Sequence, residues 1–129
     1  MSRLLTTGVI LAAFAASAAA QDWYHQRDAR FHGDWRPHLF TYVRQDLEHV
    51  WSGHAADQER ARLQRTEEEL TQMQADLDHG RWDNGILNDV IDSIRKSSDD
   101  QRLAPRDRNI LADDVNRLKE FQDQHNRGH

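Results

Sequence analysis

Histidines are the residues of this sequence best suited to metal chemistry. There are eight, namely His25, His32, His38, His49, His54, His79, His125 and His129. Zinc and copper bind neutral imidazole, and two ligands on one helix need a spacing of three or four residues to share a face. His49 and His54 are five apart across Ser52-Gly53, and no HExxH pattern occurs. Asp46 with His49, and His54 with Asp57, do have a spacing of three, so a histidine-based metal-binding or metal-responsive function stays open as an alternative.

Oxygen ligands for calcium are the second candidate chemistry, because two acidic segments resemble each other. The chain reads RWDNGILNDVID over 81–92 and PRDRNILADDVN over 105–116. A calcium loop needs oxygen ligands at alternating positions, a glycine at the sixth and a bidentate glutamate at the twelfth. Placing Leu103 at the eighth position would put Lys96 first and Asp107 last, and a cation in the leading position argues against calcium. We interpret the two segments as helix starts, each with an acidic entry and a buried stripe.

Catalytic patterns are the third class considered. Acidic residues are frequent, but nothing pairs them as a general acid and a general base. No nucleophile motif, phosphate loop or dinucleotide fingerprint occurs. The acidic runs 67–69 and 113–114 are predicted to be solvated surface. We therefore expect no enzyme activity, no catalytic residue and no cofactor.

Charge and cysteine usage narrow the partners and the chemistry further. The 129 residues contain 17 Lys plus Arg, 22 Asp plus Glu and no cysteine, with a formal net charge of -5. Only Arg3 among the charged residues lies within the first 20, so the other 109 residues carry 16 cations against 22 anions, or -6. Nucleic acid is not an expected partner, because phosphate binding needs clustered cations. Disulfides, thiol catalysis and cysteine-based metal sites are excluded.

The first 20 residues are predicted to be a secretory signal peptide. Arg3 precedes the apolar run LLTTGVILAAFAASA, and small residues end at Ala20. The run is shorter than the ~20 residues of a membrane span, so we expect cleavage near Ala20 and no membrane span in the mature protein. The predicted location is the periplasm or the extracellular space.

Four amphipathic helices must position whatever side chains carry the function. Apolar residues recur at helical spacing over 35–51, about 56–78, 83–97 and from Pro105 onward. The predicted core positions are Leu39, Phe40, Val43, Leu47, Val50, Trp51, Leu63, Thr66, Leu70, Met73, Leu77, Ile86, Leu87, Val90, Ile91, Ile94, Ile110, Leu111, Val115, Leu118 and Phe121. This pattern predicts an all-α fold, a small and mostly antiparallel bundle of about four helices. We assign 21–129 to a single helical domain, with 34–129 as the bundle.

The stretch 21–33 shows no clear period and is predicted to be an irregular aromatic arm. Its rings could fold back over the core as a lid, or they could form an exposed strip for a partner, since Trp, Tyr and Arg often anchor interfaces. For the second case, the candidate protein-binding residues are Trp23, Tyr24, Phe31, Trp35 and Phe40.

A short motif adds a resemblance. LTQMQ, residues 70–74, matches the LTxxQ motif of the exported helical chaperones Spy and CpxP. That family carries the motif near helix starts and usually twice, whereas here it occurs once and in mid-helix. The chain also resembles small exported all-helical bacterial proteins of unassigned function, most of all in RLAPRDRNILADDVNRL over 102–118. The chaperone resemblance implies binding of unfolded clients.

The function expected from these observations is protein binding without catalysis. We predict an exported envelope protein that binds other proteins through apolar helix faces, in a chaperone-like or stress-related role. The partner would be another protein or an unfolded client. A homodimer would also fit, because the narrow stripe from Leu63 to Leu77 could pair between chains.

Overall fold

Helices are the only regular elements in the part of the chain that the structure describes. This computed structural model describes residues 21–52, 54 and 57–128, so the predicted signal peptide lies outside the described residues. The backbone forms two compact units, a first unit that ends at Trp35 and a second unit that begins at Arg36. The all-helical prediction is confirmed for these residues. None of the described helices is both long and apolar enough to cross a membrane.

The first unit corrects the prediction of an irregular arm, because residues 21–32 are helical. Its aromatic side chains contact arginines at helical spacing. The Arg27 guanidinium carbon lies 4.6 Å from the ring centre of Phe31, and that of Arg30 lies 5.8 Å from the ring of Trp23. Arginines therefore lie on the same face of this helix as the aromatic rings. Because that face mixes apolar and charged residues, a search for apolar periodicity alone does not detect it.

The second unit begins with a short 3-10 turn, η1 (Arg36–His38), followed by α2 (Leu39–Trp51). Pro37 lies in the 3-10 turn, so the predicted helix over 35–51 is regular only from Leu39. No side chain from the cap position, His38, satisfies the first backbone N–H groups of α2. A residue from another helix supplies this cap, as described below.

The next helix is α3 (Asp57–Asp78), and Gly80 lies in the turn that follows its last residue. Gly80 has φ of +71°, a left-handed conformation that glycine adopts without a side-chain clash. The Arg81 N–H donates to the Asp76 carbonyl at 2.7 Å and the Gly80 N–H to the Leu77 carbonyl at 3.1 Å, the hydrogen bonds of a Schellman motif. The turn directs the chain toward Trp82.

The last two helices are α4 (Asn84–Ser98) and α5 (Pro105–Arg127). The Asp83 carboxylate caps α4 by accepting the Ile86 N–H at 3.0 Å. Pro105 opens α5, with Asp107 in its first turn. The two similar segments are thus both helix starts, as predicted. Lys96 lies within α4, so the calcium-loop alignment would begin inside a helix.

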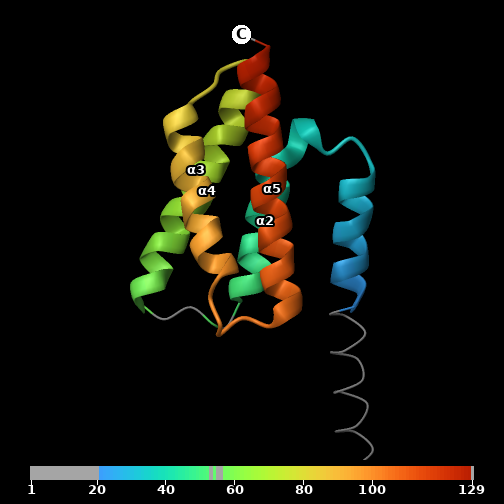
Figure 1. The fold of residues 1–129 in the computed structure, drawn as a ribbon, viewed down its shortest axis with the longest axis vertical. Helices are drawn as coiled ribbons and strands as arrows, with labels where there is room; N and C mark the ends of the chain where they lie inside the picture. Colours follow the sequence, from blue (N-terminus) through green and yellow to red (C-terminus); the bar gives the residue numbers. More distant parts are fainter. Residues whose placement is uncertain (1–20, 53, 55–56, 129) are drawn as a thin grey trace, which may run out of the picture. The chain divides into compact units, whose positions relative to one another are not determined.

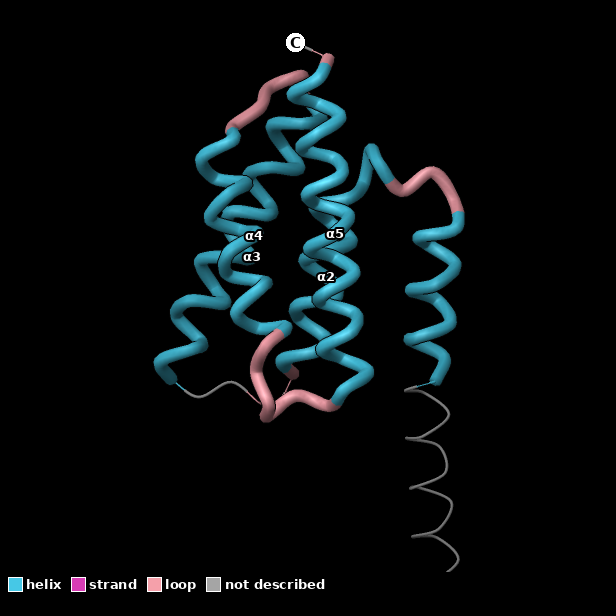
Figure 2. The backbone as a smooth tube through the Cα atoms, viewed as in Figure 1, coloured by secondary structure: helices cyan, strands magenta, loops and turns pink. Residues whose placement is uncertain are grey.

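These four helices pack side by side around one core (Figure 1), with contacts between α2 and α3, α3 and α4, α4 and α5, and α2 and α5. The α3–α4 connection lies at the end where α5 finishes, and the α4–α5 connection lies at the other end (Figure 2). Nearly all the predicted core residues are buried. Leu63, Leu70 and Met73 are at most 5% exposed within the single chain. The α3 stripe is therefore not available to pair with a second chain, except at Leu77, which is half-buried.

Polar contacts join the helices at the end away from Trp82. The Trp51 indole N–H donates to Ser97 Oγ at 3.2 Å, linking α2 to α4. The Arg102 guanidinium carbon lies 5.5 Å from the Trp51 ring centre, and Arg102 also pairs with Glu59 of α3 and with Asp100. The surface around Trp82, at the opposite end of the helices, is built from other residues.

Candidate binding site at the aromatic end

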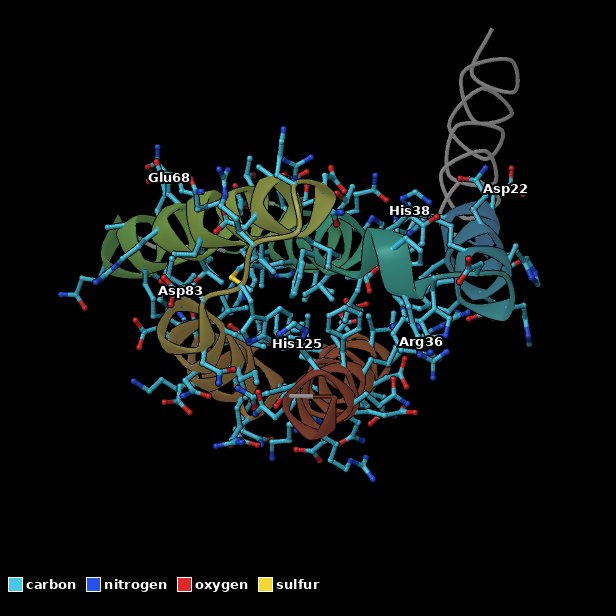
Figure 3. All side chains as sticks on the ribbon, turned by 90° about the horizontal axis from the view of Figure 1, so that it is seen from above. Asp22, Arg36, His38, Glu68, Asp83 and His125 are labelled. Atoms are coloured by element: carbon cyan, nitrogen blue, oxygen red, sulfur yellow. The ribbon has the colours of Figure 1, made fainter. Side chains whose placement is uncertain are left out.

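Four rings gather at the end of the second unit where α5 finishes, and we call this cluster the aromatic end. Phe40 comes from α2, Trp82 from the α3–α4 connection, and Phe121 and His125 from α5. The ring centres of Phe40 and Phe121 are 5.7 Å apart, and those of Trp82 and Phe121 are also 5.7 Å apart. The His125 imidazole stacks on Trp82 at 3.7 Å with an angle of 15° between the planes. Figure 3 looks along the helices and labels His125 on α5, Asp83 before α4 and Arg36 in η1.

Amide side chains hold Trp82 in this cluster. The Trp82 indole N–H donates to Asn84 Oδ1 at 2.9 Å, and Gln122 Nε2 of α5 donates to the same oxygen at 3.2 Å. Asn84 Nδ2 in turn donates to Asn126 Oδ1 at 3.3 Å. Trp82 is half-buried, so part of its ring still faces solvent. The position of Trp82 is therefore set by side chains of α4 and α5 and by the turn at Gly80.

A surface cavity of about 430 Å³, which we call the end cavity, adjoins this cluster. Its lining residues are Arg36, Pro37, Leu77, Asp78 and Phe121. Leu77 and Phe121 are half-buried and Pro37 is exposed, so the cavity presents apolar surface to solvent. Arg36 pairs with Glu120 of α5 at 3.3 Å and donates to Gln124 Oε1 at 3.2 Å. This arrangement suits an apolar side chain with polar groups at the rim.

Gln74 joins two of the cavity walls. Its Nε2 donates to the Pro37 carbonyl at 2.8 Å and to Asp78 Oδ1 at 3.0 Å. Its Oε1 accepts the Thr41 N–H at 3.1 Å and so supplies the cap that α2 lacks. One side chain of α3 thus fixes η1, the first turn of α2 and Asp78.

The LTxxQ residues all connect α3 to its surroundings. Leu70 is fully buried in the core, and Thr71 Oγ accepts from the Arg44 guanidinium of α2 at 2.9 Å. Gln74 forms the contacts to η1 and α2 just described. The motif therefore has a local role in this chain, which is to hold α2 against α3.

Three further surface cavities of the second unit are lined by more charged and polar side chains than apolar ones. A cavity of about 310 Å³ between α3 and α4 has no apolar lining residue. Its lining residues are Arg62, Arg65, Thr66, Glu69, Asp89, Asp92, Ser93 and Lys96. Two adjoining cavities of about 420 and 390 Å³ lie between α2 and α3 and share Glu48, Gln64 and Glu67.

Two glutamates in these polar cavities have raised pKa values. Burial raises the pKa of Glu67, the Glu48 carboxylate raises it further, and Arg44 opposes the shift. Burial and then Asp89 raise the pKa of Glu69. Both side chains are half-buried, which corrects the prediction of solvated surface for Glu67 and Glu69, whereas Glu68 between them is exposed as predicted.

Two aspartates are buried, although the acidic residues are predicted from the sequence to be solvated. Asp114 of the run 113–114 is fully buried, and so is Asp46 on α2. Each makes interactions within the protein. Asp114 follows Leu111 by three residues and precedes Leu118 by four, so helical spacing already places it on the apolar face. That spacing is the signal that could have identified it.

The predicted protein-binding residues fall in both units. Trp23 and Tyr24 make an edge-to-face contact at 5.2 Å, and Phe31 and Trp35 lie 6.2 Å apart, all within the first unit. Phe40 is fully buried in the second unit. Its ring belongs to the core and not to an accessible surface, so Phe40 supports the aromatic end from beneath.

The sequence did not indicate Trp82 as a site residue, and it indicated His125 only as one of eight histidines that could bind a metal ion. Leu77 and Phe121 appeared only as predicted core residues, and both are half-buried. Each is the last apolar residue in the stripe of its helix, α3 for Leu77 and α5 for Phe121. This position could have indicated partial exposure, because the ends of helices border solvent. The stacking of Trp82 on His125, 43 positions apart, depends on the tertiary fold.

No group of three or more His, Asp or Glu side chains in the described residues is arranged to hold a metal ion. Three of the histidines have neighbours of other kinds. His38 lies 5.6 Å from the Tyr42 ring, His79 Nδ1 is 2.7 Å from the Ala75 carbonyl, and His125 stacks on Trp82. Comparisons of the chain with protein-family models, with curated proteins and with solved structures gave no match.

Proposed function

We propose that the mature chain is a non-catalytic binding protein that holds apolar side chains of other proteins at the end cavity. The observation that carries this proposal is the gathering of Leu77, Phe121 and Trp82, all half-buried, beside a cavity of about 430 Å³. Accessible apolar surface on a folded protein commonly marks an interaction site. Apolar residues are the majority of the lining of the end cavity, whereas polar and charged residues are the majority in the other three cavities described, which favours the aromatic end.

The scaffold of this proposal is an antiparallel four-helix bundle formed by α2 to α5. Two contacts support it. The ring of Phe40, near the start of α2, lies 5.7 Å from the ring of Phe121, near the end of α5, and Arg36 just before α2 donates to Gln124 of α5. The start of α2 therefore lies beside the end of α5. The consecutive connections at opposite ends also support it. In such a bundle a site at one end can vary without disturbing the core.

Unfolded polypeptide is the partner class that we favour. Three of the five residues lining the end cavity are apolar, and the two charged ones, Arg36 and Asp78, already have partners within the protein, which suits a client recognised by apolar character. This supports a chaperone-like role. Binding by the rings of the first unit is an additional prediction, which needs variants of its own.

The proposed place of action is the bacterial envelope, either the periplasm or outside the cell. It depends on removal of residues 1–20, with Gln21 as the first mature residue. N-terminal sequencing of the exported protein tests this. A mature chain that still begins at Met1 would contradict it.

A reductive aggregation assay tests the proposed function directly. The probe is insulin, whose B chain aggregates when dithiothreitol reduces it. The reductant does not alter this protein, because it has no cysteine. We expect the mature protein to delay light scattering, and Leu77→Gln to weaken the effect by about fivefold or more, the equivalent of about 1 kcal/mol.

Ile86→Gln is the matched control for this assay. Ile86 is also a half-buried aliphatic residue, but it does not line the end cavity. We expect this variant to suppress aggregation as the wild type does. No suppression by the wild type, or equal losses in the two variants, would contradict the proposed function.

A further inference from the structure

We infer that Gln74 is a positioning residue of the end cavity, whose amide nitrogen sets the separation of two cavity walls. This inference rests on the proposed function for its binding consequence. Its geometry stands independently, because Nε2 donates to Pro37 on one wall at 2.8 Å and to Asp78 on another at 3.0 Å. Both acceptors line the cavity.

The two ends of the Gln74 amide have separable roles. Oε1 accepts the Thr41 N–H at 3.1 Å, which satisfies one of the backbone donors left open at the start of α2. That contact stabilises the helix. Nε2 instead connects η1 to the last turn of α3, where Leu77 and Asp78 lie. A variant that keeps the oxygen and loses the nitrogen therefore distinguishes capping from cavity positioning.

Gln74→Glu is that variant, because it keeps the side-chain length and an accepting oxygen. An ionised carboxylate has no hydrogen to donate to the Pro37 carbonyl, and it repels the Asp78 carboxylate. Gln74→Met removes both the donor and the acceptor while it keeps a similar length. Gln72→Met is the matched control, since Gln72 also donates to an aspartate four residues later, Asp76 at 2.9 Å.

Three measurements on the full mature chain test the inference: hydrogen exchange of the Thr41 amide, the NMR shifts of the Leu77 methyl groups, and suppression of insulin B-chain aggregation. In Gln74→Met we expect Thr41 exchange to rise about tenfold or more, together with shifted Leu77 methyls and weaker suppression. In Gln74→Glu we expect protected Thr41 but shifted Leu77 methyls and weaker suppression. The control Gln72→Met should match the wild type in all three.

Two results would overturn the inference. One is a Gln74→Glu variant whose Leu77 methyl shifts equal those of the wild type, which would leave Gln74 as a helix cap only. The other is shifted methyls with unchanged suppression in both Gln74 variants, which would separate the wall geometry from binding. If the wild type does not suppress aggregation, the proposed function fails, and the Leu77 shifts alone then decide whether Gln74 positions the walls.

Discussion

Glu67 lines two surface cavities between α2 and α3, and we expect its carboxyl group to make the stability of the protein depend on pH. Burial raises the pKa of this carboxyl, the nearby Glu48 carboxylate raises it further, and Arg44 partly offsets both. Between its ordinary pKa and its raised pKa, the folded state binds more protons than the unfolded state. Stability is therefore lost as the pH rises through this interval, and the ionised carboxylate is a constant penalty above it.

We predict that Glu67→Gln is more stable than the wild type at pH 7. The difference should shrink as the pH falls below the raised pKa of Glu67 and then below the ordinary pKa of glutamate, about 4.3, because the carboxyl group becomes protonated and neutral, as the glutamine amide is. Urea unfolding at several pH values measures it. Glu68→Gln is the control, because this neighbouring side chain is exposed and should leave the pH dependence unchanged. A Glu67→Gln variant that is less stable at pH 7 would contradict the assignment.

Residue roles were predictable from the sequence only where helical spacing alone decides them. Leu70 and Leu111 lie inside their stripes and are fully buried, as expected. Gln74 carries no such signal, because its partners at Pro37 and Thr41 come from another segment of the chain. Likewise, Trp82 belongs to the aromatic end because the turn at Gly80 brings it against Phe121 and His125 of α5.

At the scale of elements, the helix of residues 21–32 carries the remaining binding prediction. Trp23 and Tyr24 contact each other edge to face, and Arg30 lies over Trp23. We predict that changing Trp23 and Tyr24 together to Ser weakens the suppression of insulin aggregation. Both rings are half-buried and lie outside the second unit, so we expect the melting temperature to fall by no more than about 4 °C, the shift that about 0.5 kcal/mol causes in a domain of this size.

The control for this double variant changes His25 and His32 together to Ser. Both are exposed on the same helix, so the control reports the effect of two serines on helix stability. A large fall in melting temperature for the Trp23 and Tyr24 variant alone would show that the rings are structural. Unchanged suppression would remove them from the binding surface.

Element boundaries followed from periodicity and from turn residues. The helices predicted over 83–97 and from Pro105 correspond to α4 (Asn84–Ser98) and α5 (Pro105–Arg127), because Asp83 and Pro105 are specific start signals. The first unit was missed because arginines alternate with its rings. The start of α2 was misplaced because Pro37 lies in a 3-10 turn.

At the scale of the molecule, α2 to α5 share one core, and Leu111 is fully buried in it. We predict that Leu111→Ala lowers the free energy of unfolding of the mature chain by about 2 to 5 kcal/mol. Leu, Ile, Val and Phe make up only 20 of the 109 residues after the predicted signal peptide, so this loss is a large part of a typical margin. Thermal melts followed by far-ultraviolet circular dichroism measure it.

Lys119→Ala is the control for the core variant. Lys119 is exposed on the same helix, so its loss should shift the melt only slightly. If both variants melt alike, Leu111 does not lie in a shared core. A gradual loss of helical signal without a transition would instead contradict cooperative folding of the second unit.

The order in which the helices pack has a consequence for folding kinetics. Each of α2, α3 and α4 contacts the helix that follows it in the chain, and α2 also contacts α5, which is the last helix. Mostly local contacts favour rapid folding, on the order of microseconds to milliseconds. The α2–α5 contact joins the most distant segments, and it brings Pro37 and Phe121 together at the end cavity. The end cavity is therefore complete only in a chain whose α2 and η1 have docked on α5, because its lining includes Pro37 from η1 and Phe121 from α5.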